Sequence, residues 1–284
     1  MTVVVAWKRA LKGNVEELCF ASDSRLRGGG MMSCAQKVFA LDRGDVAMAF
    51  AGDTAIAYPY ILQVINSING YRETETRGAD IVKVRFHVIK MLNQLVKGIR
   101  DRERTEDFPD IQIILGGYSW LEKKFHLWKI CYKKDLKRFH FDTAYSYGGV
   151  EECITYAGDR GDGPAKDGKI SFKSFFKKKM IDEFGRALQN KKLDMEPLHY
   201  LIEFLQQNES NDSSISFPPQ LVKVYQHMNA LYIPLVDGRN YIYYCGRKLF
   251  ENEHVDEWPL SMDSFERIDP RSIKWVVKNG VSND

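Results

Sequence analysis

The sequence predicts an α+β fold, and the order of its strand-like and helix-like segments carries that prediction. Short β-branched and apolar runs come first, two amphipathic stretches follow, and strand-like runs return before a second pair of helical stretches. Blocks of strands separated by blocks of helices are typical of α+β proteins, whereas α/β folds alternate strand and helix. The chain has no internal repeat of about 20–50 residues, so a solenoid is not expected.

The composition is that of an ordinary globular chain. Of its 284 residues, 44% are hydrophobic and 28% are charged, and the net charge is only +3. No apolar run approaches the ~20 residues needed to cross a bilayer. The five cysteines form no CxxC pair, and the six histidines lack the spacing of metal ligands. We therefore expect a cytoplasmic protein that has no cofactor, no metal, and no nucleic-acid or membrane partner.

The N-terminal quarter predicts two hairpins. Residues 2–8 and 17–22 are β-branched or apolar and flank the turn-forming Lys12-Gly13-Asn14. Residues 37–41 and 46–51 form the second pair, joined by an Asp-Arg-Gly-Asp turn. We expect four short strands here.

Helical spacing follows this first block of strands. Residues 55–68 form one amphipathic stretch, and residues 81–99 form a second, longer one. Their apolar side chains recur at the three- and four-residue intervals of one helix face. Each stretch therefore predicts a helix that buries one stripe against a sheet.

The second half predicts strands, then helices, then strands. A meander is expected over 111–117, 124–131 and 138–143, followed by a short helix over 150–157 and a Gly/Asp-rich loop over 158–171. The remaining expected elements are helices at 172–189 and 195–207, a polar loop at 208–216, and strands at 220–226, 230–236 and 241–245. We expect one domain over 1–246, with an inserted loop and helix at about 158–193, and an irregular appendage over 247–284.

Thr2 is the residue of greatest chemical interest, because it follows Met1 and opens an apolar strand. Removal of Met1 would place a hydroxyl and a free α-amine on one residue, which is a known pairing of nucleophile and base. The ordinary pKa of an α-amine is about 7.7–8.0, so part of it is a free base near neutral pH. Many chains begin Met-Thr, so the surrounding residues decide what this dipeptide means.

Three further segments follow Thr2 in an order that bears on its role. Ala21-Ser22-Asp23-Ser24-Arg25 ends the second strand, Lys37 opens the third, and Ala51-Gly52-Asp53 leads from the fourth strand into a helix. With Thr2, this order resembles the proteasome β-subunit and bacterial HslV family of N-terminal nucleophile hydrolases, most clearly over residues 2–60. The resemblance implies a four-layer αββα sandwich in which two antiparallel sheets lie face to face.

The resemblance also implies roles for these residues. Lys37 would lie beside the Thr2 hydroxyl and lower the pKa values of that hydroxyl and of the amine. Asp23 would pair with Lys37, and Gly52 would offer its backbone N–H to the oxyanion formed during attack. Each of them also has a plainer interpretation, as a surface lysine, a turn aspartate or a turn glycine.

Two other positions depart from the family pattern. The family has a Ser-Gly before its third helix and an Asp-x-x-Ser-Gly group late in the chain. Here Ser146, within Tyr-Ser-Tyr-Gly-Gly, is the first candidate, and Asp212 and Ser216 are the second pair, without the glycines. These departures bear on activity more than on fold.

The resemblance predicts a threonine peptidase that hydrolyses peptide bonds in peptides or unfolded proteins through Thr2 after Met1 is removed. It also implies a homo-oligomer, with an ATP-dependent unfoldase as a possible partner class. Two alternatives stay open. One is a catalytically silent, proteasome-like scaffold or binding subunit, and the other is an amidohydrolase that acts on a small molecule.

Overall fold

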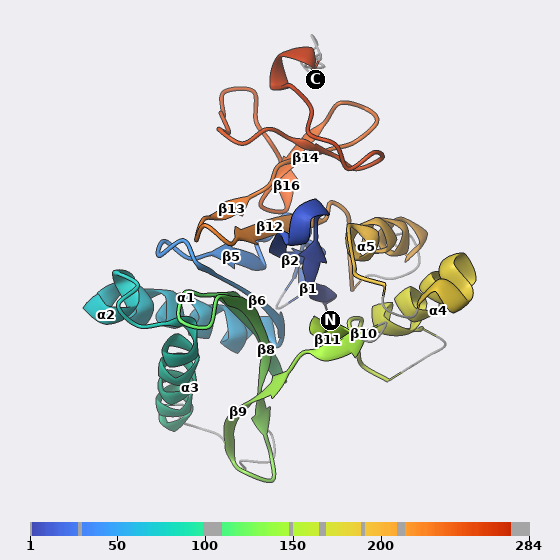
Figure 1. Cartoon of the computed structure of the whole chain (residues 1–284). Helices are drawn as coiled ribbons and strands as arrows, with labels where there is room; N and C mark the ends of the chain where they lie inside the picture. Colours follow the sequence, from blue (N-terminus) through green and yellow to red (C-terminus); the bar gives the residue numbers. More distant parts are fainter. Residues whose placement is uncertain are drawn as a thin grey trace.

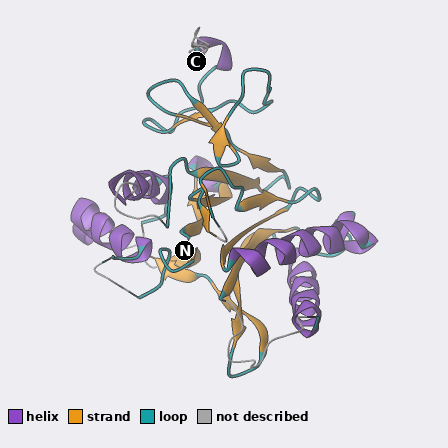
Figure 2. Ribbon diagram, turned by 180° about the vertical axis from the view of Figure 1, so that it is seen from behind, coloured by secondary structure: helices purple, strands orange, loops and turns teal. Residues whose placement is uncertain are grey.

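The structure, a computed structural model, has two β-sheets packed face to face with helices on both outer sides (Figure 1, Figure 2). It describes residues 2–27, 30–98, 110–147, 150–164, 169–188, 191–208 and 214–273.

The first sheet is six-stranded, in the order β10-β11-β1-β2-β12-β13, and every neighbouring pair in it is antiparallel. Strand β1, which begins just after Thr2, lies inside the sheet between β11 and β2. The strands are β1 (Val4–Ala10), β2 (Glu16–Ser22), β10 (Tyr145–Tyr147), β11 (Val150–Ala157), β12 (Gln220–Tyr225) and β13 (Ala230–Tyr232).

The second sheet is five-stranded and follows chain order, β5-β6-β7-β8-β9, again with antiparallel neighbours. Its strands are β5 (Val38–Ala40), β6 (Val46–Gly52), β7 (Ile111–Ser119), β8 (Lys124–Lys133) and β9 (Arg138–Thr143). A separate two-stranded ribbon pairs β3 (Leu26–Arg27) with β4 (Met31–Met32).

Alternation along β1 explains the layering. Val4 and Ala6 point into the core between the two sheets, whereas Val5 and Trp7 point into the core beneath the helices. The inter-sheet core also contains Ala49 and two other alanines of β6, and these small side chains let the sheets approach closely.

Two helix pairs complete the sandwich. Helices α4 (Phe172–Phe184) and α5 (Glu196–Asn208) cover the six-stranded sheet, and α1 (Thr54–Gly70) and α3 (Ile81–Lys97) cover the five-stranded one (Figure 1). Both α1 and α3 begin at an aspartate whose side chain accepts a backbone N–H of the first turn. The predicted αββα sandwich is thereby confirmed. The short helical turns are α2 (Arg72–Glu75), η1 (Lys12–Asn14), η3 (Gly185–Leu188) and η4 (Pro270–Ser272).

A small four-stranded sheet follows the sandwich, at the top of Figure 1. Its strands β14 and β15 lie before residue 246, and β16 and β17 lie after it, so the segment after 246 is not irregular throughout as predicted. The four strands are β14 (Leu235–Val236), β15 (Ile242–Tyr244), β16 (Arg247–Lys248) and β17 (Leu260–Ser261).

The helix predicted over 150–157 is wrong, because Val150–Ala157 is strand β11. Val150, Cys153, Ile154 and Ala157 recur at helical intervals, which produced the misassignment. The strand lies inside the sheet and its residues 153–157 are all buried, so this part lacks the alternation of a half-exposed strand.

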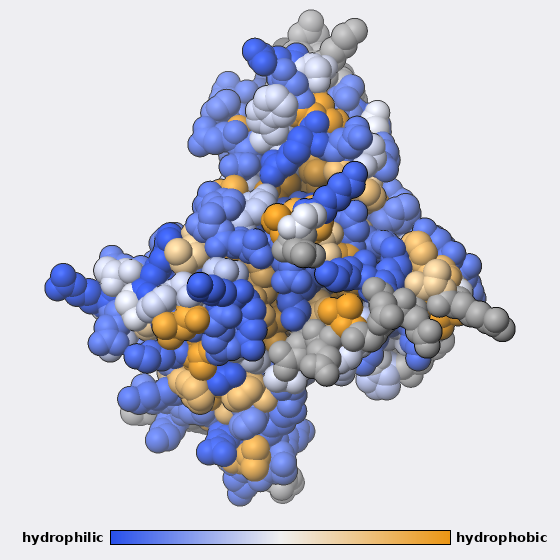
Figure 3. All heavy atoms as spheres, viewed as in Figure 1, coloured by the Kyte–Doolittle hydropathy of each residue, from blue (hydrophilic) through white to orange (hydrophobic). Residues whose placement is uncertain are grey.

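Polar side chains cover most of the face drawn in Figure 3, and apolar side chains form small separate groups on it. Among the described residues, no helix combines the length and apolar character that a bilayer span requires.

Candidate active site

Thr2 is held at the start of β1 by the turn that follows β11. Its backbone N–H donates to Asp159 Oδ1 at 3.0 Å, and its carbonyl oxygen accepts the Arg160 N–H at 3.2 Å. Gly158 makes this close approach possible, because a Cβ there would lie 2.1 Å from the Thr2 carbonyl oxygen. Its φ of +91° also favours glycine. Thr2 itself is only 3% exposed.

Lys37 connects the Thr2 hydroxyl to a carboxylate. Its Nζ donates to Thr2 Oγ1 at 3.0 Å and to Asp23 Oδ1 at 2.8 Å, and both ion-pair partners are fully buried. The Lys37 backbone is fixed from both sheets, since its N–H donates to Gln220 Oε1 of β12 and its carbonyl accepts the Phe50 N–H of β6. These two hydrogen bonds hold the Lys37 backbone in place between the two sheets.

Asp23 accepts three hydrogen bonds in this site. Besides Lys37, the backbone N–H of Val3 donates to Oδ1 at 3.1 Å, and the backbone N–H of Arg25 donates to Oδ2 at 2.9 Å. The carboxylate thus has donors on both oxygens, and its bond to Val3 ties the site to the first strand.

The electrostatic balance at Lys37 bears on its chemistry. Burial lowers the pKa of Lys37, and the nearby carboxylates of Asp23 and Asp159 oppose that shift. An ammonium whose pKa is lowered gives up its proton more readily than an exposed lysine. Lys37 can therefore polarise the Thr2 hydroxyl as a donor and take part in moving its proton.

Gly52 is the last residue of strand β6. Asp53 donates its N–H to Asp110, the residue before β7, whereas Phe50 donates its N–H to Lys37 on the other side. Because successive N–H groups point to opposite edges of a strand, the Gly52 N–H points to the Lys37 edge. A Cβ at Gly52 would lie 1.8 Å from the Asp110 carbonyl oxygen, so this position requires glycine. Its role as an oxyanion donor stays a prediction.

Of the remaining predicted residues, Ser146 does not join Thr2 in the described structure. Ser146 is exposed on edge strand β10, whose Tyr145 pairs with Ile154 rather than with the Thr2 end of β11, so its predicted position was wrong. Asp212 lies outside the described residues. Ser216 is buried next to Ser24, but its Oγ has no hydrogen-bond partner within the described chain.

Asp159 is the site residue that sequence reasoning missed. Its signal is the Gly-Asp-Arg-Gly sequence over 158–161, which follows an apolar run at the point where a strand ends. Because that run is predicted as a helix, the turn after it falls within the Gly/Asp-rich loop predicted over 158–171. The correct strand assignment places Asp159 opposite Thr2, two residues beyond the Val4–Ala157 pair.

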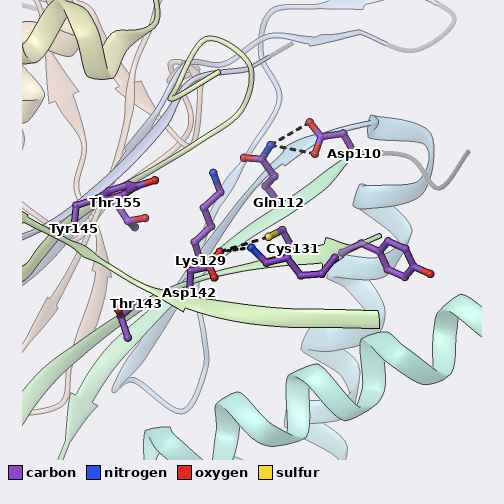
Figure 4. Close-up of a pocket in the computed structure, with 10 residues that line it drawn as sticks. Asp110, Gln112, Lys129, Cys131, Asp142, Thr143, Tyr145 and Thr155 are labelled. Carbon is purple, nitrogen blue, oxygen red and sulfur yellow. Dashed lines mark hydrogen bonds and ion pairs between the residues drawn. The ribbon is translucent and has the colours of Figure 1, made fainter. Parts of the chain in front are cut away.

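A hollow of about 430 Å³ lies next to this turn, and Figure 4 shows residues that line it. Gln112 in its wall accepts the Gly158 N–H at 2.9 Å, and Lys129 is paired with Asp162 at 2.8 Å. Both lysines and aspartates line the hollow, so its charges do not favour a ligand of one sign. Its lining residues are Asp110, Gln112, Lys129, Cys131, Tyr132, Lys133, Asp142, Thr143, Tyr145 and Thr155. The described residues contain no group of three His, Cys, Asp or Glu side chains placed to hold a metal ion.

Sequence comparison gives no relative for this chain: no family model matches it, and neither does any curated protein. Structural comparison does find similar proteins, among them Anbu (ancestral beta-subunit) from Yersinia bercovieri. The two share 16% sequence identity with a TM-score of 0.53, over 81% of this chain and 86% of Anbu. At this identity the likeness shows the fold alone. It does not support the predicted membership of the proteasome β-subunit and HslV family, and we correct that assignment. The chain therefore shares a proteasome-like αββα scaffold with Anbu.

Proposed function

We propose that this protein is an N-terminal nucleophile hydrolase that cleaves peptide bonds with Thr2 after Met1 is removed. One observation carries the proposal: the buried Lys37 Nζ contacts both the Thr2 hydroxyl and Asp23. A hydroxyl, a cation and an orienting carboxylate in line form the arrangement that activates a nucleophile.

The reaction proceeds through an ester. Thr2 Oγ1 attacks the substrate carbonyl carbon while its proton passes to the α-amine, and Lys37 stabilises the negative charge that develops on Oγ1. The Gly52 N–H donates to the oxyanion of the tetrahedral intermediate. The protonated amine then gives its proton to the leaving nitrogen, the C–N bond breaks, and water hydrolyses the acyl-threonine ester.

Removal of Met1 is a chemical requirement of this mechanism. While Met1 is attached, the nitrogen of Thr2 is an amide, whose lone pair is delocalised and cannot accept the proton. The same nitrogen becomes a base with a pKa near the physiological range once it is free.

Intact mass and peptide turnover test the proposal together. We expect protein that has lost Met1 to hydrolyse fluorogenic peptide amides, Thr2→Ala to lose this activity, and Thr2→Ser to keep part of it. Turnover by Thr2→Ala equal to that of the wild type would rule out the proposal. Circular dichroism of each variant serves as the folding control.

A catalytically silent scaffold is the second candidate. It is favoured by the burial of Thr2 and by the absence of Ser146 from the site. Such a protein would lose Met1 and still show no turnover with any peptide. An amidohydrolase would instead turn over small amides in preference to peptides.

Location and assembly belong to the same proposal. A cytoplasmic location is supported by five cysteines that are all free thiols. Assembly into a homo-oligomer and delivery of substrate by an ATP-dependent unfoldase stay predictions. Light scattering of the purified protein measures the first of these directly.

A further inference from the structure

We propose that Asp159 binds the α-amine of Thr2 once Met1 is gone, and that this ion pair sets the pH at which the amine becomes a free base. This inference rests on the proposed function of Thr2. It assigns a positioning residue that the sequence resemblance did not supply.

The contact with Asp159 is already formed by the nitrogen that would become the amine. That nitrogen lies 3.0 Å from Asp159 Oδ1, while the next residue, Arg160, donates its N–H to the Thr2 carbonyl oxygen. Two consecutive residues thus hold both polar backbone groups of Thr2. Cleavage of the Met1–Thr2 bond converts the N–H donor into an ammonium and turns a hydrogen bond into an ion pair.

Hydrogen bonds made by Arg160 and Gly161 hold the turn that carries Asp159. The Arg160 guanidinium donates to the Ile170 carbonyl at 2.5 Å and to Asn208 Oδ1 at the end of α5 at 3.1 Å. Within the turn, the Gly161 N–H donates to the Gly158 carbonyl at 2.8 Å. A carboxylate on such a fixed turn orients its partner with little loss of side-chain entropy.

The charges around the amine leave Asp159 as its carboxylate partner. Lys37 is the nearby cation, and its Nζ is bound to Asp23. The Arg160 guanidinium points away to α5. Arg25 lies close enough to lower the pKa of Lys37, Asp53 caps α1, and Asp110 accepts from Gln112. The charged side chains at the ends of the surrounding elements are Asp23, Arg25, Lys37, Asp53, Asp110, Asp159 and Arg160.

Two opposed effects act on the amine. Lys37, a like charge, favours the neutral amine, whereas Asp159 favours the ammonium. The amine must be neutral to accept the Thr2 proton, so the ion pair moves the rising limb of the pH–rate profile toward higher pH. In return, the carboxylate keeps the amine in the position where it can receive and deliver that proton.

Two substitutions separate the charge from the position. Asp159→Asn keeps an acceptor oxygen and removes the charge, so the rising limb of kcat/KM is expected to move toward lower pH by roughly half a unit to one unit. Asp159→Ala removes both, so kcat is expected to fall about tenfold or more with little change in KM. Asp162→Asn is the matched control in the same turn. The rising limb of its pH–rate profile should coincide with that of the wild type.

A measurement that needs no turnover completes the test. In protein lacking Met1, the pKa of the Thr2 amine, followed by competitive acetylation, should be lower in Asp159→Asn than in the wild type. The role of Asp159 would be overturned by an amine pKa that is unchanged in Asp159→Asn. It would also be overturned if the wild type, Asp159→Asn and Asp159→Ala shared the same rising limb and the same kcat. Failure of the proposed function itself gives a different result, namely no turnover by wild-type protein that has lost Met1, or Thr2→Ala as active as the wild type.

Discussion

Lys37 and Asp23 form a buried ion pair next to the Thr2 hydroxyl, so their loss should affect both stability and the proposed chemistry. Both side chains are fully buried, and the pair connects the Thr2 hydroxyl to the backbone of Val3, just before β1. A buried ion pair is costly to break from one side, because the remaining charge loses its partner in a medium that solvates it poorly. The two residues are nevertheless not equivalent, since Asp23 has two backbone donors in addition to Lys37.

We therefore predict a different cost for each partner. Asp23→Ala leaves Lys37 and two N–H groups unpaired and is expected to lower the free energy of unfolding by about 3–5 kcal/mol. Lys37→Met leaves Asp23 with its backbone donors and should cost less, while reducing kcat on the order of a hundredfold or more. Urea denaturation and peptide turnover measure the two effects. Equal stability losses would contradict this account of Asp23.

The element scale shows what the sequence could and could not predict. Hairpins with clear turns and helices with a regular apolar stripe were predicted within a few residues, as for β9 and α1. Strand β11 was misassigned, because burial on both faces removes the alternation that distinguishes a strand. The same error left Asp159 in a predicted loop, away from the strand end that places it beside Thr2. The contact between Thr2 and Asp159 spans 157 positions, and no local pattern encodes it.

The turn after β11 gives a prediction at this scale. Gly158→Ala places a Cβ within 2.1 Å of the Thr2 carbonyl oxygen, so the turn must move away from Thr2. We expect a loss of about 2 kcal/mol or more in unfolding free energy, together with loss of turnover. Gly13→Ala is the matched control, because Gly13 also has a positive φ but has no atom within 4 Å of its Cβ position. It should cost about 1 kcal/mol and leave turnover intact.

A line of charges across three strands gives a pH prediction. Glu17 of β2 accepts from Arg9 of β1 at 2.6 Å and from Lys223 of β12 at 2.7 Å. Burial raises the pKa of Glu17, but Lys223 and Arg9 outweigh it and hold the pKa below its ordinary value of 4.5. The unfolded chain therefore binds the proton first, so stability falls as the pH drops from about 4.5 through the lowered pKa.

Glu17→Gln isolates this effect, because glutamine does not titrate. At neutral pH the variant should be less stable than the wild type by about 3 kcal/mol, since Lys223 loses its charged partner. The difference should narrow as the pH is lowered below about 4.5. Thermal unfolding of both proteins between pH 3 and pH 7 gives the comparison, and a difference that stays constant would refute the assignment.

At the scale of the whole molecule, the sandwich brings the site together. Thr2 and Asp23 adjoin strands β1 and β2 of one sheet, whereas Lys37 precedes β5 and Gly52 ends β6 in the other, so the site exists only where the sheets meet. The order of strand and helix blocks predicted an α+β fold, and the sequence resemblance implied the four-layer sandwich. The sequence resemblance placed Thr2, Asp23 and Lys37 together, and the structure brings the three into contact.

The spacing between the sheets should thus control the site. Ala49 of β6 faces the inter-sheet core and pairs with Val38, the residue after Lys37. Ala49→Leu adds volume to this packed layer and is expected to cost about 1–3 kcal/mol. Turnover should fall with it, because β5 and Lys37 shift relative to Thr2. Denaturation and kinetics on the same preparation test this, and full activity in a destabilised variant would contradict the coupling.

The central claim is that Thr2 is a nucleophile, and covalent labelling tests it most directly. A peptide β-lactone acylates an activated hydroxyl and adds its whole mass to that residue. In protein that has lost Met1, we expect one adduct, mapped by mass spectrometry to the peptide that begins at Thr2. The adduct should form more slowly in Lys37→Met and should be absent from Thr2→Ala. Absence of an adduct, or an adduct that maps elsewhere in protein whose N-terminus is free Thr2, would contradict the account.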